Sequence, residues 1–597
     1  MKKIIFIFSL YCIAFAWSGC DDLLNVTPET DFTDENFWKT EGDLKGASIR
    51  LYQQLPYNGP DTRGDEFFNT SGPNSFSTGI RQIPYEDDNW TNNYRCIFTA
   101  NNIIEKGANT PVNENIRNRY LGEARFFRAW YYFDLVCKFG DVPLVLKSFT
   151  GTTDPDLKMP RTPREIVIQQ CYDDLAFAAE WLPTRAAMES VTNEFERRFV
   201  TRSAALGLIV RIGLREGTML KFHNLGNETL WKAHLQKSID AYNLLKSEGH
   251  QLYSVGGPSI SYLALFIDES NASNKETIFG KAYGPNHNTN DATSVNHSYT
   301  SSLNDRYVSR RMIDTYLYAD GLPRDKTNLA VTPELSFNHV FGYERDGITP
   351  IAGGMGARDP RLNLTFWRNN DPQDTEQEVV AGARISWYYT GKRVYYIPLQ
   401  GYTPKKGFIG ECYYWDWTDR ILIRWGEMLI SYAEALYEIN GSITDAQLDE
   451  TVNALRARVG FNVMLTNAFI TTHGLDMREE IRRERTVELM SENFRYNDLI
   501  RWKTAETVMT KAITGIKFVS EDSSPELLED PTFVQRLTDA TGKINGVQEY
   551  DYPEGDIYIL EKSTDRRFNP AKDYYYPIPV FEISQSGGSI VQNPEWY

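Results

Sequence analysis

Residues 122–145 read GEARFFRAWYYFDLVCKFGDVPLV, and this stretch decides the fold that we expect. Between 124 and 136, apolar and aromatic residues occupy nearly every side of the helix that the stretch predicts. Gly140 and Pro143 end the pattern, as glycine and proline commonly do after a helix. A helix that is apolar all round is buried, so we expect this one in the middle of a larger assembly of helices.

Helical spacing recurs on both sides of this stretch. Residues 34–55 begin with acidic side chains and then place Leu44, Ala47, Leu51 and Leu55 at helical intervals. Further helices are predicted at 163–181, 203–215, 231–247, 421–439, 445–458 and 475–491. Between about 285 and 418 glycine, asparagine, proline and aromatics dominate, RISWYY (384–389) and RVYYIPL (393–399) alternate as short strands do, and from about 516 the chain is again irregular. The sequence therefore predicts a mainly α fold with long loops and a few short strands.

The first twenty residues resemble an export signal. Lys2 and Lys3 precede an apolar run at 4–17 that is too short to span a membrane. Ser18 and Gly19 then lead into Cys20, the arrangement of a bacterial lipoprotein whose cysteine carries acyl chains, although Trp17 stands where such signals usually have leucine. Several acyl chains together anchor a protein stably. We expect Cys20 to be lipidated; the alternative is a secreted soluble protein in which Cys20 is ordinary.

Composition excludes several classes of function. The 597 residues carry a formal charge of -17 without basic runs, which argues against nucleic acid as a partner. The cysteines beyond the anchor form no C-x-x-C pair, so zinc and redox sites have no support: Cys96, Cys137, Cys171 and Cys412. The motifs H-E-x-x-H, G-x-S-x-G and G-x-x-x-x-G-K-[ST] are absent from the sequence. No cofactor is expected, and a structural calcium ion held by loop oxygens stays open but cannot be placed.

Ordered motifs along the chain resemble one known family. They are CDDLLNVTPETDFTDENFWKTEGDL (20–44), WTNNYRCIFTANNII (90–104), the stretch at 122–145, YLYADGLPRD (316–325), RDPRL (358–362), RWGEMLISYAEALYEIN (424–440), IRRERTVELMSENFRYNDLIRW (481–502) and the closing KDYYYPIPVFEISQSGGSIVQNPEWY (572–597). Together they resemble the SusD/RagB family, whose usual last motif QNPGY reads QNPEW here. The resemblance covers nearly the whole chain after Cys20.

The resemblance implies a nutrient-binding outer-membrane lipoprotein of Bacteroidetes, with a helical fold that contains tetratricopeptide-like helix pairs. Such proteins sit as a lid over a TonB-dependent, SusC-like barrel transporter and capture oligosaccharides, or less often peptides as RagB does, for import. The chain then divides into a signal peptide (1–19), a lipid anchor and tether (20–40), an N-terminal helical region (41–250) and a C-terminal region (251–597) with a loop-rich insert at 285–418. Asp21 and Asp22 fit the acidic stretch that accompanies display on the cell surface in these bacteria, unless they are simply part of a solvated linker.

One charged helix invites a test for catalysis. In IRRERTVELMSEN (481–493), Glu484 and Glu488 continue the apolar face that begins at Ile481, and two inward carboxylates could form a glycosidase pair. Four arginines lie close by in the sequence, however: Arg482, Arg483, Arg485 and Arg495. Arginines lower the pKa of a neighbouring carboxyl, whereas a glycosidase acid needs its pKa raised. We therefore expect a structural ion-pair network at these glutamates, and no catalytic residue.

Sugar rings lie against aromatic faces while their hydroxyls bond to polar side chains, so we searched the loops for that mixture. Three loop stretches have it, at 64–90, 283–302 and 384–396, and 11 of the 34 residues at 384–417 are aromatic. The candidate ligand-binding residues are Phe68, Phe76, Arg81, Tyr85, Tyr283, His297, Tyr299 and Trp387. Trp90 is expected in the core, and the tyrosine-rich runs at 395–396 and 413–417 in the core or at the transporter interface.

Two other classes of function remain as alternatives. A surface glycan-degrading enzyme would need carboxylates among aromatics in a cleft without arginine partners. The nearest such acids lie in one loop: Asp65, Glu66, Glu86, Asp87 and Asp88. A purely structural or adhesive surface protein would bind no soluble ligand at all.

Overall fold

The computed structural model describes residues 37–53, 55, 61–69, 72–149, 151, 153–193, 196–268, 274–282, 306–368, 371, 377–380, 383–385, 401–407, 419–517 and 557–596. Cys20, Tyr283, His297, Tyr299 and Trp387 lie outside these residues, so their predicted roles stay predictions. Within the described ranges, no helix is both long and apolar enough to cross a membrane.

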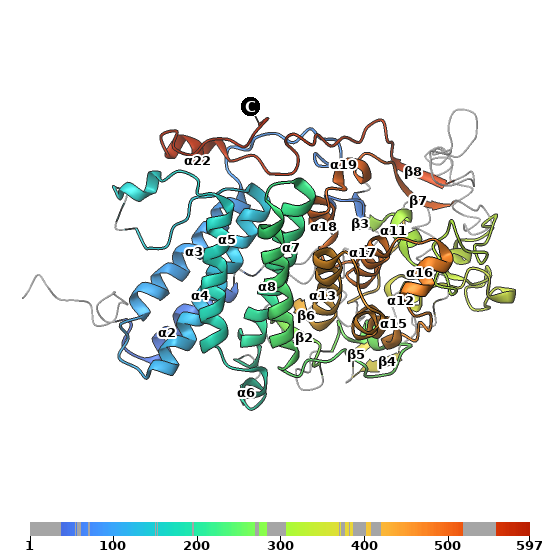
Figure 1. The fold of residues 1–597 in the computed structure, drawn as a ribbon, viewed down its shortest axis with the longest axis horizontal. Coiled ribbons are helices and arrows are strands. Elements are labelled where there is room, and N and C mark those ends of the chain that lie inside the picture. The colour runs from blue at the N-terminus through green and yellow to red at the C-terminus, as the bar shows by residue number, and fades with distance from the viewer. Residues whose placement is uncertain are drawn as a thin grey trace, which may run out of the picture.

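The N-terminal half is a row of long helices (Figure 1). They are α2 (Glu41–Gln53), α3 (Asp88–Gly107), α4 (Glu114–Phe139), α5 (Arg164–Trp181), α7 (Arg202–His223) and α8 (Glu228–Lys246). Neighbours in the row pack in sequence, α3 on α4, α4 on α5, α5 on α7 and α7 on α8. This stacking of successive helices is the paired arrangement that the family resemblance implies.

Helix α4 is buried as its sequence predicts. The side chain of Asn113 caps its first turn by accepting from the Asn115 N–H, and Gly140 ends it with a φ of 75°. Phe127 and Tyr132 are among its fully buried side chains, and both lie in the main hydrophobic core. That core continues from the helical row into the C-terminal half, so the two predicted regions share one interior.

The C-terminal half is built of shorter elements around α13 (Trp425–Asn440) and α17 (Met477–Glu488), which pack on each other and join the row through α7 and α8 (Figure 1). Its other α-helices are α9 (Ser261–Ala264), α11 (Arg310–Thr315), α12 (Pro360–Thr365), α14 (Asp445–Glu450), α15 (Val452–Arg458), α16 (Asn467–His473), α18 (Arg495–Arg501), α19 (Ala505–Val508) and α22 (Val580–Gln585). Short helical turns complete the chain: α6 (Arg185–Glu189) and the 3₁₀ turns η2 (Pro155–Lys158), η3 (Glu196–Arg198), η4 (Phe337–Phe341) and η5 (Ala352–Gly354).

The described strands form four antiparallel pairs. These are β1 (Phe67–Asn69) with β3 (Arg306–Val308), β2 (Thr277–Lys281) with β6 (Arg420–Arg424), β4 (Gln377–Val380) with β5 (Ala383–Ile385), and β7 (Ile513–Lys517) with β8 (Ile557–Glu561). Only β5 falls in a predicted strand, and its partner β4 precedes it instead of following it. The mainly α fold with few short strands is confirmed.

Several helix boundaries differ from the prediction, and α2 begins at Glu41 although the helical pattern was expected from residue 34. Residues 421–424 belong to strand β6, and the predicted helix at 445–458 is two helices separated at Thr451, whose φ and ψ are -117° and -90°. Helix α7 extends to His223, eight residues beyond its predicted end. Its glycines at 213 and 217 allow close approach to α8 instead of ending the helix: a Cβ at Gly213 would lie 2.6 Å from the His234 carbonyl oxygen.

Candidate ligand-binding cleft

A cleft of about 920 Å³ opens between helices α3, α4 and α7, the segment 492–498 and Tyr576. This volume lies in the range of small-molecule sites, roughly 300–1,000 Å³. The lining mixes six aromatic side chains with arginines, acids and amides, which is the composition that binding of a sugar requires. The aromatic members are Phe76, Trp130, Tyr131, Phe133, Phe494 and Tyr576.

Flat side chains alternate along part of this lining. The Cζ atom of Arg211 lies 5.6 Å from the ring centre of Trp130 and 5.1 Å from that of Phe494. The Arg485 Cζ lies 5.3 Å from the ring centre of Phe494 as well. Arg211 is fixed in turn because it donates to both carboxylate oxygens of Glu427 at 2.7 Å. We call Trp130, Arg211, Phe494 and Arg485 the aromatic–arginine floor; Trp130 and Phe494 keep part of their surface exposed.

Polar side chains with free hydrogen-bonding capacity surround the floor. Six lining residues are half-buried or exposed, and their side chains make no hydrogen bond with any other described residue: Ser75, Gln82, Asp88, Asn92, Asn493 and Asn497. We call this set the polar rim. Hydroxyl and amide groups with unused donors and acceptors can bond to the hydroxyls of a ligand without breaking an internal bond.

Most charges in the cleft are paired inside the protein. Burial tends to raise the pKa of Glu492, but the positive charges of Arg424 and Lys406 outweigh it and hold that pKa below its usual value. Asp87 caps α3 by accepting from the Asn89 N–H at 2.7 Å. Other lining charges form the pairs Arg63–Asp61, Arg81–Asp573, Lys138–Asp134, Arg215–Glu216, Arg485–Asp498 and Arg501–Asp498. Pairing within the protein thus leaves the aromatic, hydroxyl and amide groups of the lining, together with Asp88, to contact a ligand.

Two family models match this chain, and the one described as the SusD family matches residues 268–596, more than half of its length. This chain belongs to the SusD family. The second model, described as "Starch-binding associating with outer membrane", matches residues 64–214, which include α3, α4 and the loop before them. Both sides of the cleft therefore come from segments that are similar to SusD-type proteins.

Individual relatives are distant in sequence but similar over their full length. A SusD-like protein of Formosa agariphila is 24% identical over 524 residues, covering 82% of this chain and 90% of its own. One of Bacteroides ovatus is 22% identical and covers 98% and 97%. A crystal structure of a SusD-like carbohydrate-binding protein from Bacteroides fragilis superposes with a TM-score of 0.66 at 22% identity over 92% and 99% of the two chains. A laminarin-binding SusD-like protein gives 0.53 at 19% identity over 93% and 100%. The predicted SusD-like fold is confirmed.

The predicted ligand residues of this SusD-family chain fall in different places. Phe76 and Arg81 line the cleft, but Arg81 is only 9% exposed and donates to Asp573 at 2.9 Å while its Cζ lies 4.6 Å from the Phe76 ring centre. Tyr85 lies just outside the lining, 64% exposed, with its ring 5.7 Å from that of Phe581. Phe68 is 1% exposed in the second hydrophobic cluster, beneath the β1–β3 pair, so it packs the core and has no face for a ligand.

Sequence reasoning missed the floor of the cleft. Trp130 lies in the helix that was expected to be buried on all sides, and Phe494 and Arg485 lie in the motif that was expected to be scaffold. No sequence signal marked Trp130 and Phe133: both keep exposed surface on α4, but they stand in the same apolar context as its buried residues. Arg211 was missed because the search for ligand residues was confined to loops, whereas Arg211 lies in helix α7.

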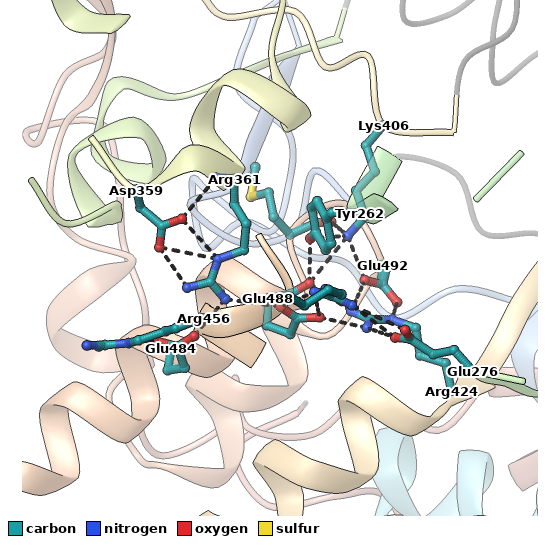
Figure 2. Close-up of polar contacts among 12 residues, drawn as sticks. Tyr262, Glu276, Asp359, Arg361, Lys406, Arg424, Arg456, Glu484, Glu488 and Glu492 are labelled. Atoms are coloured by element: carbon teal, nitrogen blue, oxygen red, sulfur yellow. Dashed lines mark hydrogen bonds and ion pairs between the residues drawn. The ribbon is translucent and has the colours of Figure 1, made fainter. Parts of the chain in front are cut away.

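The expected structural ion-pair network is present behind the cleft (Figure 2). Glu488 accepts from Arg458 at 2.7 Å, from Arg424 at 2.7 Å and from Arg361 at 3.0 Å. Glu484 pairs with Arg361 at 2.6 Å. Although burial tends to raise the pKa of Glu488, the three arginines hold it well below its usual range. The expected ion-pair network is therefore present, but its arginines come from remote segments and not from the neighbours in the sequence. Those neighbours pair elsewhere: Arg482 with Glu479, Arg483 with Glu480, Arg485 with Asp498 and Arg495 with Asp65.

Two of the loop acids that could have indicated an enzyme lie away from the cleft, whereas Asp87 and Asp88 line it. Asp65 is buried and accepts from Arg495 at 2.7 and 2.9 Å. Glu66 is buried as well and accepts from the Ser491 N–H, and neither of them lines the cleft. In the described part of the chain, no group of three or more histidine, cysteine or acidic residues could hold a metal ion.

Proposed function

We propose that this protein is a surface-exposed outer-membrane lipoprotein that binds oligosaccharides in the cleft and delivers them to a TonB-dependent, SusC-like transporter. The observation that supports binding is the combination of the aromatic–arginine floor with the polar rim in one cleft of about 920 Å³. Sugar C–H faces would lie on Trp130 and Phe494, and the rim would bond to hydroxyls. The similarity to a carbohydrate-binding protein of Bacteroides fragilis and to a laminarin-binding protein supports this assignment.

The charge balance of the cleft favours a neutral glycan. Its arginines already pair with acids of the protein and Asp88 is an acid without a partner among the described residues, so an anionic sugar would find little unpaired positive charge. The chain as a whole carries a formal charge of -17, which also repels acidic polymers at low ionic strength. A peptide is the second candidate, because amides and aromatic faces can also hold an extended backbone.

The test is calorimetric titration of the form that starts at Asp21 against neutral and acidic oligosaccharides and mixed peptides, followed by chain-length analysis of each glycan. We expect saturable heat with a neutral glycan that stays intact. Trp130→Ala and Phe494→Ala should each weaken binding about tenfold, which corresponds to about 1.4 kcal/mol. Phe98→Ala is the matched control, because Phe98 is an exposed aromatic of α3 outside the cleft lining. Heat with peptides alone would replace the glycan, and shortened glycan chains would contradict a binding role.

The anchor and the partner need their own measurements. Mass spectrometry of the membrane-extracted protein should find acyl chains on Cys20, and Cys20→Ser should release the protein from the membrane. Mild detergent extraction of outer membranes should recover a TonB-dependent barrel protein together with the wild type. A wild-type protein without acyl chains, or recovered without a barrel, would contradict the respective part of the proposal.

A further inference from the structure

A strained turn supplies part of the cleft. Ser491 and Asn493 both have a φ of 65°, a left-handed conformation that non-glycine residues seldom adopt. Such residues cost about 1–3 kcal/mol each and persist only where the surroundings hold them. The turn 490–494 ends with Asn493 of the polar rim and Phe494 of the aromatic–arginine floor, so its backbone conformation decides where two ligand-facing side chains lie.

The middle residue of this turn, Glu492, is bonded to two cationic side chains (Figure 2). Glu492 accepts from Lys406 Nζ at 2.6 Å and from the Nη2 and Nε atoms of Arg424 at 2.7 and 2.8 Å. Lys406 Nζ also donates to the Met490 carbonyl at 2.7 Å. Ionic hydrogen bonds of this length are roughly twice as strong as neutral ones. The turn is thus held at its backbone and at the side chain of Glu492.

The same cations end the preceding helix. Arg424 Nη2 donates to the Glu488 carbonyl at 2.8 Å, and the Tyr262 hydroxyl, which accepts from Lys406, donates to that carbonyl at 2.7 Å. Positive charge at the C-terminus of a helix is favourable because the last carbonyls have no partner within the helix. Lys406 and Arg424 therefore hold both the end of α17 and the turn that follows it.

These cations come from segments remote from the turn in the sequence. Lys406 lies in the segment 401–407, and Arg424 ends strand β6. Both side chains are fully buried, and burying an ion pair adds little net stability compared with apolar packing. A gain in stability alone thus does not account for them, whereas a fixed conformation of a strained turn does.

We infer that Lys406 and Arg424, acting through Glu492, are positioning residues that hold Asn493 and Phe494 in the conformation that binds the ligand. This inference rests on the proposed role of the cleft in glycan binding. It makes the segment 401–407 a determinant of affinity although it does not line the cleft.

The decisive variant is Lys406→Met, which keeps the length of the side chain and removes its charge. Arg424 still pairs with Glu492 in this variant, so the fold should persist while the turn samples other conformations. If one molecule in ten keeps the binding conformation, the apparent affinity falls tenfold. Lys406→Arg should restore most of it. The matched control is Lys405→Met, which removes the adjacent buried lysine whose Nζ donates to Asp371 at 2.8 Å instead of to the turn.

Two readouts separate positioning from a general loss of structure. Lys406→Met should add little to the affinity loss of Phe494→Ala, because both changes remove the same contact, whereas independent effects would add. Hydrogen exchange of peptides that cover 489–497 should rise in Lys406→Met and stay at the wild-type level in Lys405→Met, with or without a ligand.

Each outcome has a defined meaning. If the wild type binds a glycan, unchanged affinity and unchanged hydrogen exchange in Lys406→Met would overturn the inference. Additive losses in the double variant would also overturn it, because Lys406 would then act elsewhere. If the wild type binds no glycan but exchange at 489–497 still rises in Lys406→Met, the proposed function fails while the control of the turn by Lys406 stands.

Discussion

Replacing Glu66 by glutamine should stabilise this protein, and by an amount that depends on pH. Glu66 is 2% exposed just before strand β1, and its Oε1 accepts from the Ser491 N–H at 2.6 Å. Burial raises the pKa of Glu66 from 4.5 to about 8, and the charge of the nearby Asp61 acts in the same direction. At neutral pH the folded protein therefore holds a proton that the unfolded chain has released.

The sign and size of the effect follow from linkage. The folded state binds more protons than the unfolded state between pH 4.5 and about 8, so stability falls as the pH rises through this window. The ordinary pKa of 4.5 lies about 2.5 units below pH 7, so release of this proton in the unfolded chain lowers the free energy of unfolding by about 3 kcal/mol at pH 7. At pH 5 the same effect is less than about 1 kcal/mol. Glutamine keeps the oxygen that accepts from Ser491 and carries no titrating proton, so Glu66→Gln removes this loss.

Urea unfolding at pH 5 and at pH 7 measures the prediction directly. We expect Glu66→Gln to have a higher free energy of unfolding than the wild type. This gain should be larger at pH 7 than at pH 5, by about 2–3 kcal/mol. Glu86→Gln is the control, since Glu86 is an exposed glutamate in the loop that follows β1. Equal differences at the two pH values would refute the argument, because only a proton held by Glu66 makes the gain depend on pH.

Four further changes test the site and its support. Arg495→Met leaves the buried Asp65 carboxylate without its two-pronged partner and should cost about 3–5 kcal/mol in urea unfolding; a cost below 1 kcal/mol would contradict the pairing. Glycan affinity should change less than about twofold between roughly 20 and 500 mM salt, because the charges of the cleft are paired internally; a steep fall on titration would indicate an anionic ligand. Burial lowers the pKa of Lys406 to about 8, so this side chain loses its charge beside Glu492 when the pH rises from 7 to 9. Titrations at both pH values should therefore show weaker glycan binding at pH 9 in the wild type and not in Lys406→Arg. Gly426→Ala would place a Cβ 2.2 Å from Arg424 Nη1, and a lowered melting temperature together with faster exchange at 489–497 is expected; wild-type values would contradict this.

The sequence predicted those elements whose signal is local. Helix α4 combines an all-round apolar pattern with a glycine and a proline at its end, and both features act within one segment. The end of α7 could not be predicted in this way, because Gly213 serves close packing against α8, a partner that only the fold reveals. Likewise, Arg424 was expected inside a helical motif, but it ends strand β6 because β2 pairs there.

The ligand site was harder to predict than the scaffold for a related reason. Arg81 has the residue type and the place that a sugar contact requires, yet three aromatic rings and Asp573 surround its guanidinium. Trp130 has the sequence context of a core residue, and it lines the cleft because α4 borders an opening between the two halves. Whether an aromatic binds or packs depends on which neighbours cover it, and those neighbours are distant in the sequence.

The buried charges explain why the cleft lies at the junction of the two halves. Helices that pack only through apolar side chains can shift along each other at low cost, because the hydrophobic effect has no direction. Arg424 instead bonds at once to Glu276 before β2, to Glu488 at the end of α17 and to Glu492 in the turn, each with the fixed geometry of a guanidinium. These bonds fix the position of α17 against the strand pair β2–β6 and, through α13, against the helical row. A cleft whose floor takes Trp130 from the row and Phe494 from the turn keeps its shape only if that relative position is fixed, so the ion-pair network and the binding surface depend on each other.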